Sequence, residues 1–271
     1  MIPVLHLFPR LNSSLIDLLT GLSPVQWNSP TVCRQWLVKD IAAHLLDTAL
    51  RRVSSGRDNH FGAAPEIGSY SGLVDFLNEL NAEWVRAYKR VSPEVLVKQL
   101  SIAQDDFYEY LLTVDLREPA PYPVSWAGEE ESSQWFDIAR EYTERWHHQQ
   151  QIRQAVGAGS ILNRELYFPF LQISMLALPF HYSTQTAPEG TTIKINIVGE
   201  AGGSWVISRT ERSWEFASTD TEANNQVYID QNIAWMLFSK GVDIYEAQQY
   251  WQILGNYQLG FHALKMRAFM V

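Results

Sequence analysis

Three side chains of metal-ligating types stand at spacings that suit a single metal ion. Glu144 and His148 are four residues apart, so an α-helix would place both on one face. His44 interrupts an apolar stretch, 41–46, and a histidine there would point toward the core of a helical bundle, where bundles build metal sites. Two histidines and one carboxylate leave a coordination position open, which is typical of catalytic zinc. The pattern predicts a catalytic metal site of His44, Glu144 and His148.

Each of these residues also has a plainer interpretation. A single histidine among apolar residues is often a hydrogen-bonded core residue, and a Glu–His pair one turn apart is commonly a surface pair that stabilises its helix slightly. The neighbouring His147 lies about 100° around the helix from His148, so we do not expect both to bind one ion. We expect His147 at the surface or next to the ligands.

Arg51 and Cys33 lie on either side of His44 in the sequence and could also take part in the chemistry. Arg51 lies two turns beyond His44 and could attract an anionic substrate, although an arginine near a helix end is often simply solvated. Cys33 precedes the helix of His44 and has no histidine beside it in the sequence, so we expect a buried structural thiol and not a nucleophile.

Helical periodicity fills the chain up to about residue 157. Apolar residues recur at helical spacing in the first segment, as at Leu11, Leu15 and Leu19, and Pro24 forces a turn after it. Two stretches, 57–69 and 117–128, have the glycine and proline content of loops. The predicted helices span 5–22, 37–54, 71–90, 93–112 and 132–156. This number of helices predicts an antiparallel four- or five-helix bundle.

The periodicity changes in the last third of the chain. After an apolar segment at 163–180, residues 191–198 alternate as a half-buried strand does, and Gly202 and Gly203 form a turn toward a hairpin partner at 204–208. Further strands are predicted at 214–217 and 225–229, and helical patterning at 232–239, 244–249 and 260–270. The sequence therefore predicts an α+β protein, with a helical domain at 1–160 and an α+β domain at 161–271.

Composition restricts the class of protein and its partners. Apolar residues make up 46% of the chain, and the net charge of −9 argues against a nucleic-acid partner. The single cysteine permits no intrachain disulfide and fits a reducing compartment. No segment resembles a signal peptide or reaches the roughly 18 apolar residues of a membrane span. We expect a cytoplasmic protein without a membrane partner, and the sequence does not indicate its oligomeric state.

Two helix motifs resemble those of a known family. Residues 33–45, Cys-Arg-Gln-Trp-Leu-Val-Lys-Asp-Ile-Ala-Ala-His-Leu, and 140–148, Arg-Glu-Tyr-Thr-Glu-Arg-Trp-His-His, are similar to motifs of the mycothiol-dependent maleylpyruvate isomerases. These belong to the wider DinB-like family of metal-binding bundles. Residues 254–260 resemble the closing helix motif of that family's sterol-carrier-like C-terminal domain. The resemblance implies a DinB-like up-down four-helix bundle followed by a smaller sterol-carrier-like domain.

The resemblance also implies a chemistry. It implies that zinc, or another divalent ion, is held by His44, Glu144 and His148, and that the protein uses a low-molecular-weight thiol such as mycothiol, bacillithiol or glutathione. A divalent cation lowers the pKa of a bound thiol, and the thiolate can add to a small electrophilic substrate. We therefore predict a metal-dependent isomerase or S-transferase similar to maleylpyruvate isomerase.

Two departures from the family pattern bear on the site. The turn before Trp36 lacks the usual Pro-Gly, which we expect to change only the turn. Gln151 stands where the family commonly has an aspartate beside the ligating histidine. Such a partner fixes the imidazole tautomer and alters metal affinity by roughly 10–100-fold. Either the metal is held more weakly here, or Asp47 or Glu141 takes over this role, with Asp40 as a further candidate.

A binding protein without turnover is the alternative. Sterol-carrier-like domains can enclose apolar ligands, and the C-terminal part is rich in aromatic residues that either fill its core or line a ligand site. A non-catalytic protein that keeps the metal only for structure is a further possibility. The aromatic residues concerned are Trp205, Trp214, Trp235, Tyr245, Tyr250, Trp251 and Tyr257.

Overall fold

The computed structural model describes residues 1–62, 70–239 and 241–268, and their contacts divide the chain into two compact units. The bundle unit comprises Pro3–Leu116 and Arg145–Ser160. The sheet unit comprises Met1–Ile2, Arg117–Glu144 and the chain from Ile161 onward. Residues 117–144 therefore group with the sheet unit, whereas we predicted from the sequence that they belong to the helical domain. The predicted domain boundary near residue 160 stays a prediction.

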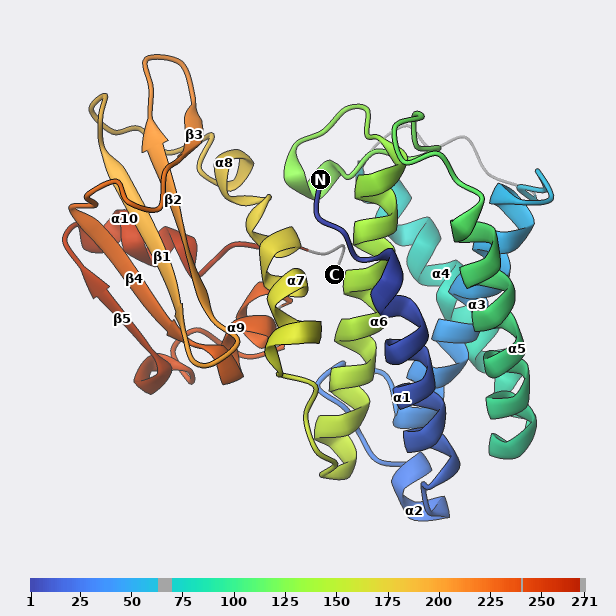
Figure 1. The fold of residues 1–271 in the computed structure, drawn as a ribbon. Helices are drawn as coiled ribbons and strands as arrows, with labels where there is room; N and C mark the ends of the chain where they lie inside the picture. Colours follow the sequence, from blue (N-terminus) through green and yellow to red (C-terminus); the bar gives the residue numbers. More distant parts are fainter. Residues whose placement is uncertain (63–69, 240, 269–271) are drawn as a thin grey trace. The chain divides into compact units, whose positions relative to one another are not determined.

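The bundle unit is built from long helices that lie side by side (Figure 1). All five predicted helices are present, within a few residues of their expected ends. A short 3-10 turn, η1 (Leu5–Leu7), precedes the first helix, and a one-turn helix, α2 (Pro24–Trp27), follows it. The predicted loop is without helix or strand at 57–62, and its remainder, 63–69, lies outside the described residues. The long helices are α1 (Phe8–Thr20), α3 (Val38–Gly56), α4 (Tyr70–Tyr88), α5 (Pro93–Leu112) and α6 (Gln134–Val156).

Local sequence signals explain where these helices begin and which face they bury. Asp40 accepts a hydrogen bond from the backbone N–H of Leu37 at 3.0 Å and so caps α3. Ser92 caps α5 through the N–H of Val95, and Pro93 follows at the first helical position. The apolar stripe of α1 is almost completely buried and packs on α5. Arg153 of α6 donates to the Ser14 carbonyl at 3.0 Å and thereby joins α6 to α1.

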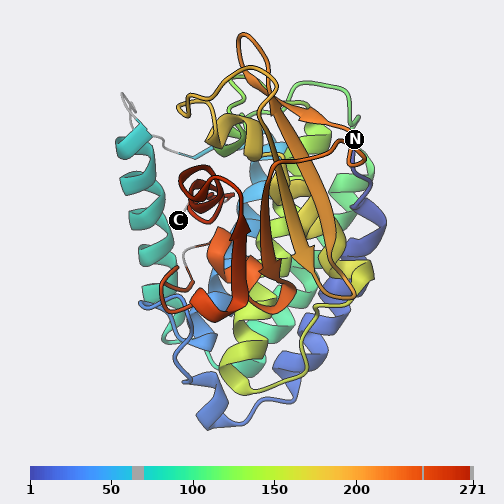
Figure 2. The same cartoon turned by 90° about the vertical axis from the view of Figure 1, so that its left-hand side faces the viewer.

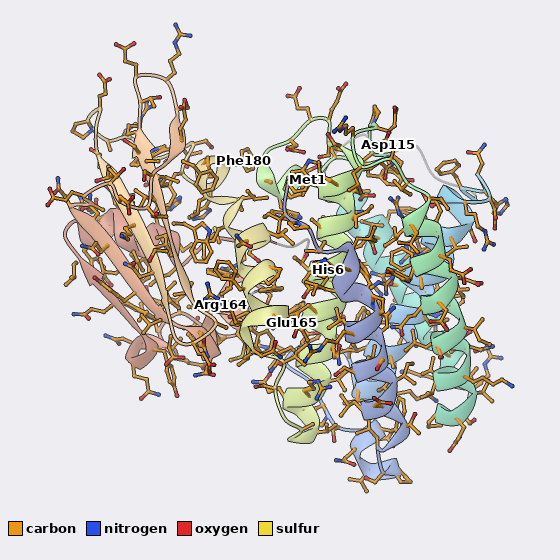
Figure 3. The ribbon with its side chains drawn as sticks, in the orientation of Figure 1. Met1, His6, Asp115, Arg164, Glu165 and Phe180 are labelled. Atoms are coloured by element: carbon orange, nitrogen blue, oxygen red, sulfur yellow. The ribbon has the colours of Figure 1, made fainter. Side chains whose placement is uncertain are left out.

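The sheet unit contains short helices and one five-stranded sheet. Its first elements are η2 (Ser125–Ala127) and the N-terminal half of α6, followed by α7 (Arg164–Met175) and α8 (Leu178–His181). At the start of α7, Arg164 lies over the Phe168 ring and donates to the Gly202 carbonyl at 3.0 Å, with Glu165 beside it (Figure 3). The strands are β1 (Thr192–Val198), β2 (Gly203–Arg209), β3 (Trp214–Ala217), β4 (Asn225–Asp230) and β5 (Trp251–Leu254).

The strands lie in the order β3-β2-β1-β4-β5 (Figure 2). The β1–β2 hairpin is antiparallel as predicted, while β1 and β4 pair in parallel, with Ile195 opposite Val227. Alternate residues of β1 (Ile193, Ile195 and Ile197) are buried. Helices α9 (Gln231–Phe238) and α10 (Tyr257–Ala263) pack on β1 and β4 and complete this core. The expected α+β class is confirmed.

The structure differs from the prediction at three places in the C-terminal region. A helix was expected at 244–249, but Asp243 accepts a hydrogen bond from the N–H of Tyr245 at 2.8 Å and holds the chain in a turn, followed by the short η3 (Gln248–Tyr250). The strand β5 was not expected, because a four-residue edge strand depends on its pairing with β4. Only the first part of the helix expected at 260–270 is helical: α10 (Tyr257–Ala263) ends at Ala263, residues 264–268 form a turn and an irregular segment, and residues 269–270 lie outside the described residues. None of the described helices is both long and apolar enough to cross a membrane.

A reciprocal pair of histidines joins α8 to α10 in the sheet unit. Nε2 of His181 lies 2.7 Å from the carbonyl of His262, and Nε2 of His262 lies 2.8 Å from the carbonyl of His181. The two rings stack with centroids 4.1 Å apart. Burial, opposed by the hydrogen bond to His262, lowers the pKa of His181 to about 4, and the charges of Arg267 and Lys265 act in the same direction as burial.

This pair makes the stability of the sheet unit depend on pH. His181 is protonated near pH 6.5 in the unfolded chain but only near pH 4 in the folded one, so the unfolded state binds the extra proton between these values. Its stabilising contribution is complete above pH 6.5 and is lost as the pH falls, by up to about 3 kcal/mol. Urea unfolding at several pH values should show this loss, and His181→Gln should reduce it. The exposed His60 supplies the control, since His60→Gln with the same reduction would assign the effect to a general change of charge.

Candidate metal centre

The bundle unit brings two of the predicted ligands together. His44 extends from α3 and His148 from α6, and their ring centroids are 4.9 Å apart at an interplanar angle of 76°. Each residue is only 8% exposed. The apolar neighbours Ile41, Leu45 and Leu46 are buried, as the sequence predicted, and they fix the face of α3 on which His44 lies. The structure therefore places two imidazoles from distant parts of the chain in direct contact.

His44 is held in the neutral form that can bind a cation. Burial, and then the neighbouring basic groups of His148, Arg51 and Arg145, keep its pKa well below the usual 6.5. Among the described residues, its buried Nδ1 atom has no hydrogen-bond partner. An unsatisfied buried polar atom of this kind costs about 1–3 kcal/mol. A partner for this nitrogen would remove that cost.

His148 has a hydrogen-bond partner that suits a metal ligand. Its Nδ1 lies 2.8 Å from Oε1 of Gln151, one turn further along α6. An amide oxygen can only accept, so Nδ1 carries the proton and the lone pair of the neutral ring lies on Nε2. Gln151 is 5% exposed. Gln151, where the resemblance led us to expect an aspartate, is therefore itself the hydrogen-bond partner of His148.

His147 is also part of this cluster. It is 5% exposed, so the expectation of a surface position is wrong; His147 is buried beside His148, and its place next to a metal ligand stays a prediction. Its Nε2 lies 3.2 Å from Nε2 of Gln151, and its ring centroid is 5.4 Å from that of His148. One glutamine side chain therefore contacts two adjacent histidines.

Trp36 covers the two imidazoles and was given no role by the sequence. Its ring centroid lies 4.8 Å from that of His44 and 6.1 Å from that of His148. A tight turn positions it, in which the N–H of Trp36 donates to the Cys33 carbonyl at 2.8 Å. Burial raises the pKa of the Cys33 thiol, in keeping with the structural role expected for this residue.

The third predicted ligand, Glu144, lies one turn before His148 on α6 and is half-buried. Within the described part of the chain, no three side chains of His, Cys, Asp or Glu converge closely enough to hold a metal as they stand. The structure thus assembles the histidine pair, and the role of Glu144 stays a prediction from its place on the helix.

The charged residues along α3 have partners of their own. Asp40 caps the helix, as described above. Arg51 lies 2.9 Å from Asp47 and donates to Oδ1 of Asn81 at 3.0 Å. Burial raises the pKa of Asp47, and the nearby Arg51 partly opposes this shift. The side chain of Arg51 remains 36% exposed, so part of the guanidinium faces solvent.

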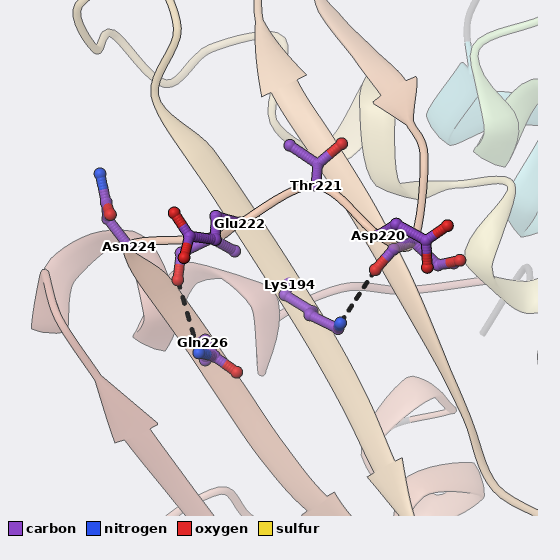
Figure 4. A pocket seen from close by; sticks show the side chains of 8 residues that line it. Lys194, Asp220, Thr221, Glu222, Asn224 and Gln226 are labelled. Atoms are coloured by element: carbon purple, nitrogen blue, oxygen red, sulfur yellow. Dashed lines mark hydrogen bonds between the residues drawn. The ribbon is translucent and has the colours of Figure 1, made fainter.

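The aromatic residues of the sheet unit divide between its core and its surface. Trp214 and Trp235 are buried, whereas Tyr245 and Tyr257 are largely exposed. A polar cavity of about 550 Å³ lies at the loop before β4, where Lys194 donates to the Thr219 carbonyl at 3.0 Å beside Asp220 and Glu222 (Figure 4). Its lining is hydrophilic, which does not suit the apolar ligand of the carrier hypothesis.

Comparison with known proteins identifies the family to which the bundle belongs. The family model described as the mycothiol maleylpyruvate isomerase N-terminal domain matches residues 8–153, more than half of the chain. The chain belongs to this maleylpyruvate isomerase-like family. His44, Glu144 and His148 all lie within the matched residues. No curated protein sequence matches the chain.

The similarity to solved structures covers residues of both units of the chain. A mycothiol-dependent maleylpyruvate isomerase is similar with a TM-score of 0.52 at 10% identity, over 86% of each chain. A variant of the mycothiol-dependent maleylpyruvate isomerase with one histidine changed to alanine gives a TM-score of 0.53 at 11% identity, again over 86% of each chain. At these identities the likeness shows a shared fold, bundle and sheet together.

Proposed function

We propose that this member of the maleylpyruvate isomerase-like family binds one divalent cation, most simply zinc, through His44, Glu144 and His148. We further propose that it uses the cation as a thiol-dependent isomerase or S-transferase acting on a small electrophile. The observation that carries the proposal is the buried His44–His148 pair, with ring centroids 4.9 Å apart. Family membership supports the reaction class.

The residues present suit such an ion. Neutral imidazole nitrogens are good ligands of zinc and of several other divalent metals. His44 supplies a neutral ring with a buried Nδ1 atom, and His148 supplies a ring whose proton is directed to Gln151. Glu144 would add the carboxylate from the preceding turn of α6. A set of three protein ligands leaves room for a thiol or a substrate.

The chain's own residues give this site its character. When bound, the cation would lower the pKa of a thiol, so that the thiol reacts as a thiolate. The Trp36 ring packs against both imidazoles. The exposed part of Arg51 would attract an anionic substrate while Asp47 and Asn81 hold the side chain in place.

The substrate class follows from the family and not from the geometry. The similar solved proteins are titled mycothiol-dependent and maleylpyruvate isomerase. At 10–11% identity the same thiol and substrate are hypotheses for this chain, and bacillithiol and glutathione are the alternative thiols. We propose that the protein acts in the cytoplasm, where such thiols are kept reduced.

The metal site leads to a direct prediction. The purified protein, supplied with zinc and dialysed, should retain about one ion per chain, because neutral imidazoles in a fixed pair bind zinc tightly. His44→Ala and His148→Ala should each lose the ion, and Glu144→Gln should weaken its binding. Inductively coupled plasma mass spectrometry measures the content. The exposed His60 provides the matched control, and His60→Ala should retain the metal of the wild type.

Two results would contradict this assignment. Metal retained in full by both His44→Ala and His148→Ala would place the ion elsewhere. No retained metal in the wild type, after exposure to excess zinc, nickel, manganese or iron, would remove the metal from the proposed function.

The reaction class can be tested separately. The zinc-loaded protein is mixed with maleylpyruvate or another small electrophilic unsaturated acid, together with mycothiol, bacillithiol or glutathione in turn. We expect turnover that requires both metal and thiol and that falls by at least about 100-fold in His148→Ala, because the loss of one ligand removes the ion that activates the thiol. Absorbance of the conjugated substrate follows the reaction. Bound metal with no turnover for any pair would favour the non-catalytic alternative.

A further inference from the structure

Gln151 contacts two histidines at once, with an acceptor at one end of its amide and a donor at the other. Its Oε1 lies 2.8 Å from Nδ1 of His148, and its Nε2 lies 3.2 Å from Nε2 of His147. The three residues occupy consecutive turns of α6, at spacings of three and four residues, and all are at least nine-tenths buried. The helix therefore holds donor and acceptor atoms opposite each other without help from another element.

The chemistry of the amide assigns a proton to each ring. The oxygen can only accept, so His148 must be protonated at Nδ1. The NH₂ group can only donate, so Nε2 of His147 must be the acceptor and that ring must also carry its proton on Nδ1. One side chain thereby selects a single tautomer of two adjacent histidines. An aspartate or glutamate would accept from His148 but could not donate to His147.

We propose that Gln151 is a positioning residue that fixes the tautomers of His147 and His148 together, and that His147 holds the far end of the amide in place. The consequence for metal binding rests on the proposed function. With Nδ1 protonated, His148 presents the lone pair of Nε2 to an ion in a fixed ring orientation. Because the bridge is neutral, it adds no negative charge to the site, whereas a carboxylate would raise the basicity of the imidazole.

Imidazole nitrogen NMR of the metal-free protein near pH 8 tests the bridge without any metal. Two-bond proton–nitrogen correlations distinguish the tautomers, and the His147→Phe and His148→Phe variants assign the signals among the seven histidines. We expect both rings as single Nδ1–H tautomers in the wild type. In Gln151→Glu, His148 should keep this tautomer and His147 should leave it. In Gln151→Met, which has a similar shape but neither hydrogen bond, both signatures should be lost.

Zinc affinity, measured by competition with a chelator, tests the consequence. Gln151→Met should bind zinc roughly 10–100-fold more weakly than the wild type, and Gln151→Glu should bind it at least as tightly. Gln154→Glu places the same charge on an exposed turn of α6 and should change affinity less than about threefold. Circular dichroism of each variant confirms that the helices are intact.

The two proposals can fail independently. An Nε2–H tautomer or a mixture at His147 in the wild type would overturn the bridge, whatever the metal does. Unchanged zinc affinity in a folded Gln151→Met variant would overturn the positioning role. If the wild type binds no metal at all, the proposed function fails, and the tautomer spectra alone decide whether Gln151 fixes both rings.

Discussion

The main physical constraint on the bundle is that it buries the polar imidazole groups of His44 and His148. His44 and His148 are nearly inaccessible to water, and a buried polar atom without a partner destabilises a fold by about 1–3 kcal/mol. His148 avoids this penalty at Nδ1 through Gln151, while Nδ1 of His44 has no partner among the described residues. An apolar residue in place of His44 would pack there without this penalty. A site that binds a cation gives a physical reason for a histidine at this position.

The surrounding elements serve to hold this pair. The cap at Asp40 sets the start of α3, and its buried apolar residues fix the rotation of that helix, so His44 faces inward. The hydrogen bond from Arg153 to the Ser14 carbonyl joins the C-terminal part of α6, beyond His148, to α1. The Cys33–Trp36 turn then brings an aromatic ring over both imidazoles. Segments more than a hundred residues apart in sequence thus define a single small region.

Local periodicity was sufficient to predict much of this fold. The helices of the bundle and the strands β1 to β4 follow from apolar spacing, since each buries one face. The region 244–254 could not be predicted in this way: a side chain of Asp243 turns the backbone at its start, and β5 exists through its pairing with β4. At the site, the sequence indicated the histidines and the position of Gln151. The contact of Trp36 with the two imidazoles depends on tertiary packing, which the sequence does not show. The spacing of Gln151 from His147 and His148 was visible in the sequence, but its hydrogen bonds to both rings depend on side-chain orientation.

We propose that His44 and His148 bind the same ion. Zinc K-edge X-ray absorption of the loaded protein, beside the His44→Ala variant, tests this most directly. We expect two imidazole groups per zinc in the wild type, recognised by outer-shell scattering, with zinc–nitrogen distances of about 2.0–2.1 Å. In the variant, any zinc that is retained should have at most one such group. A wild-type spectrum with one imidazole or none would show that the two histidines do not share an ion, and would leave them as residues of the bundle core.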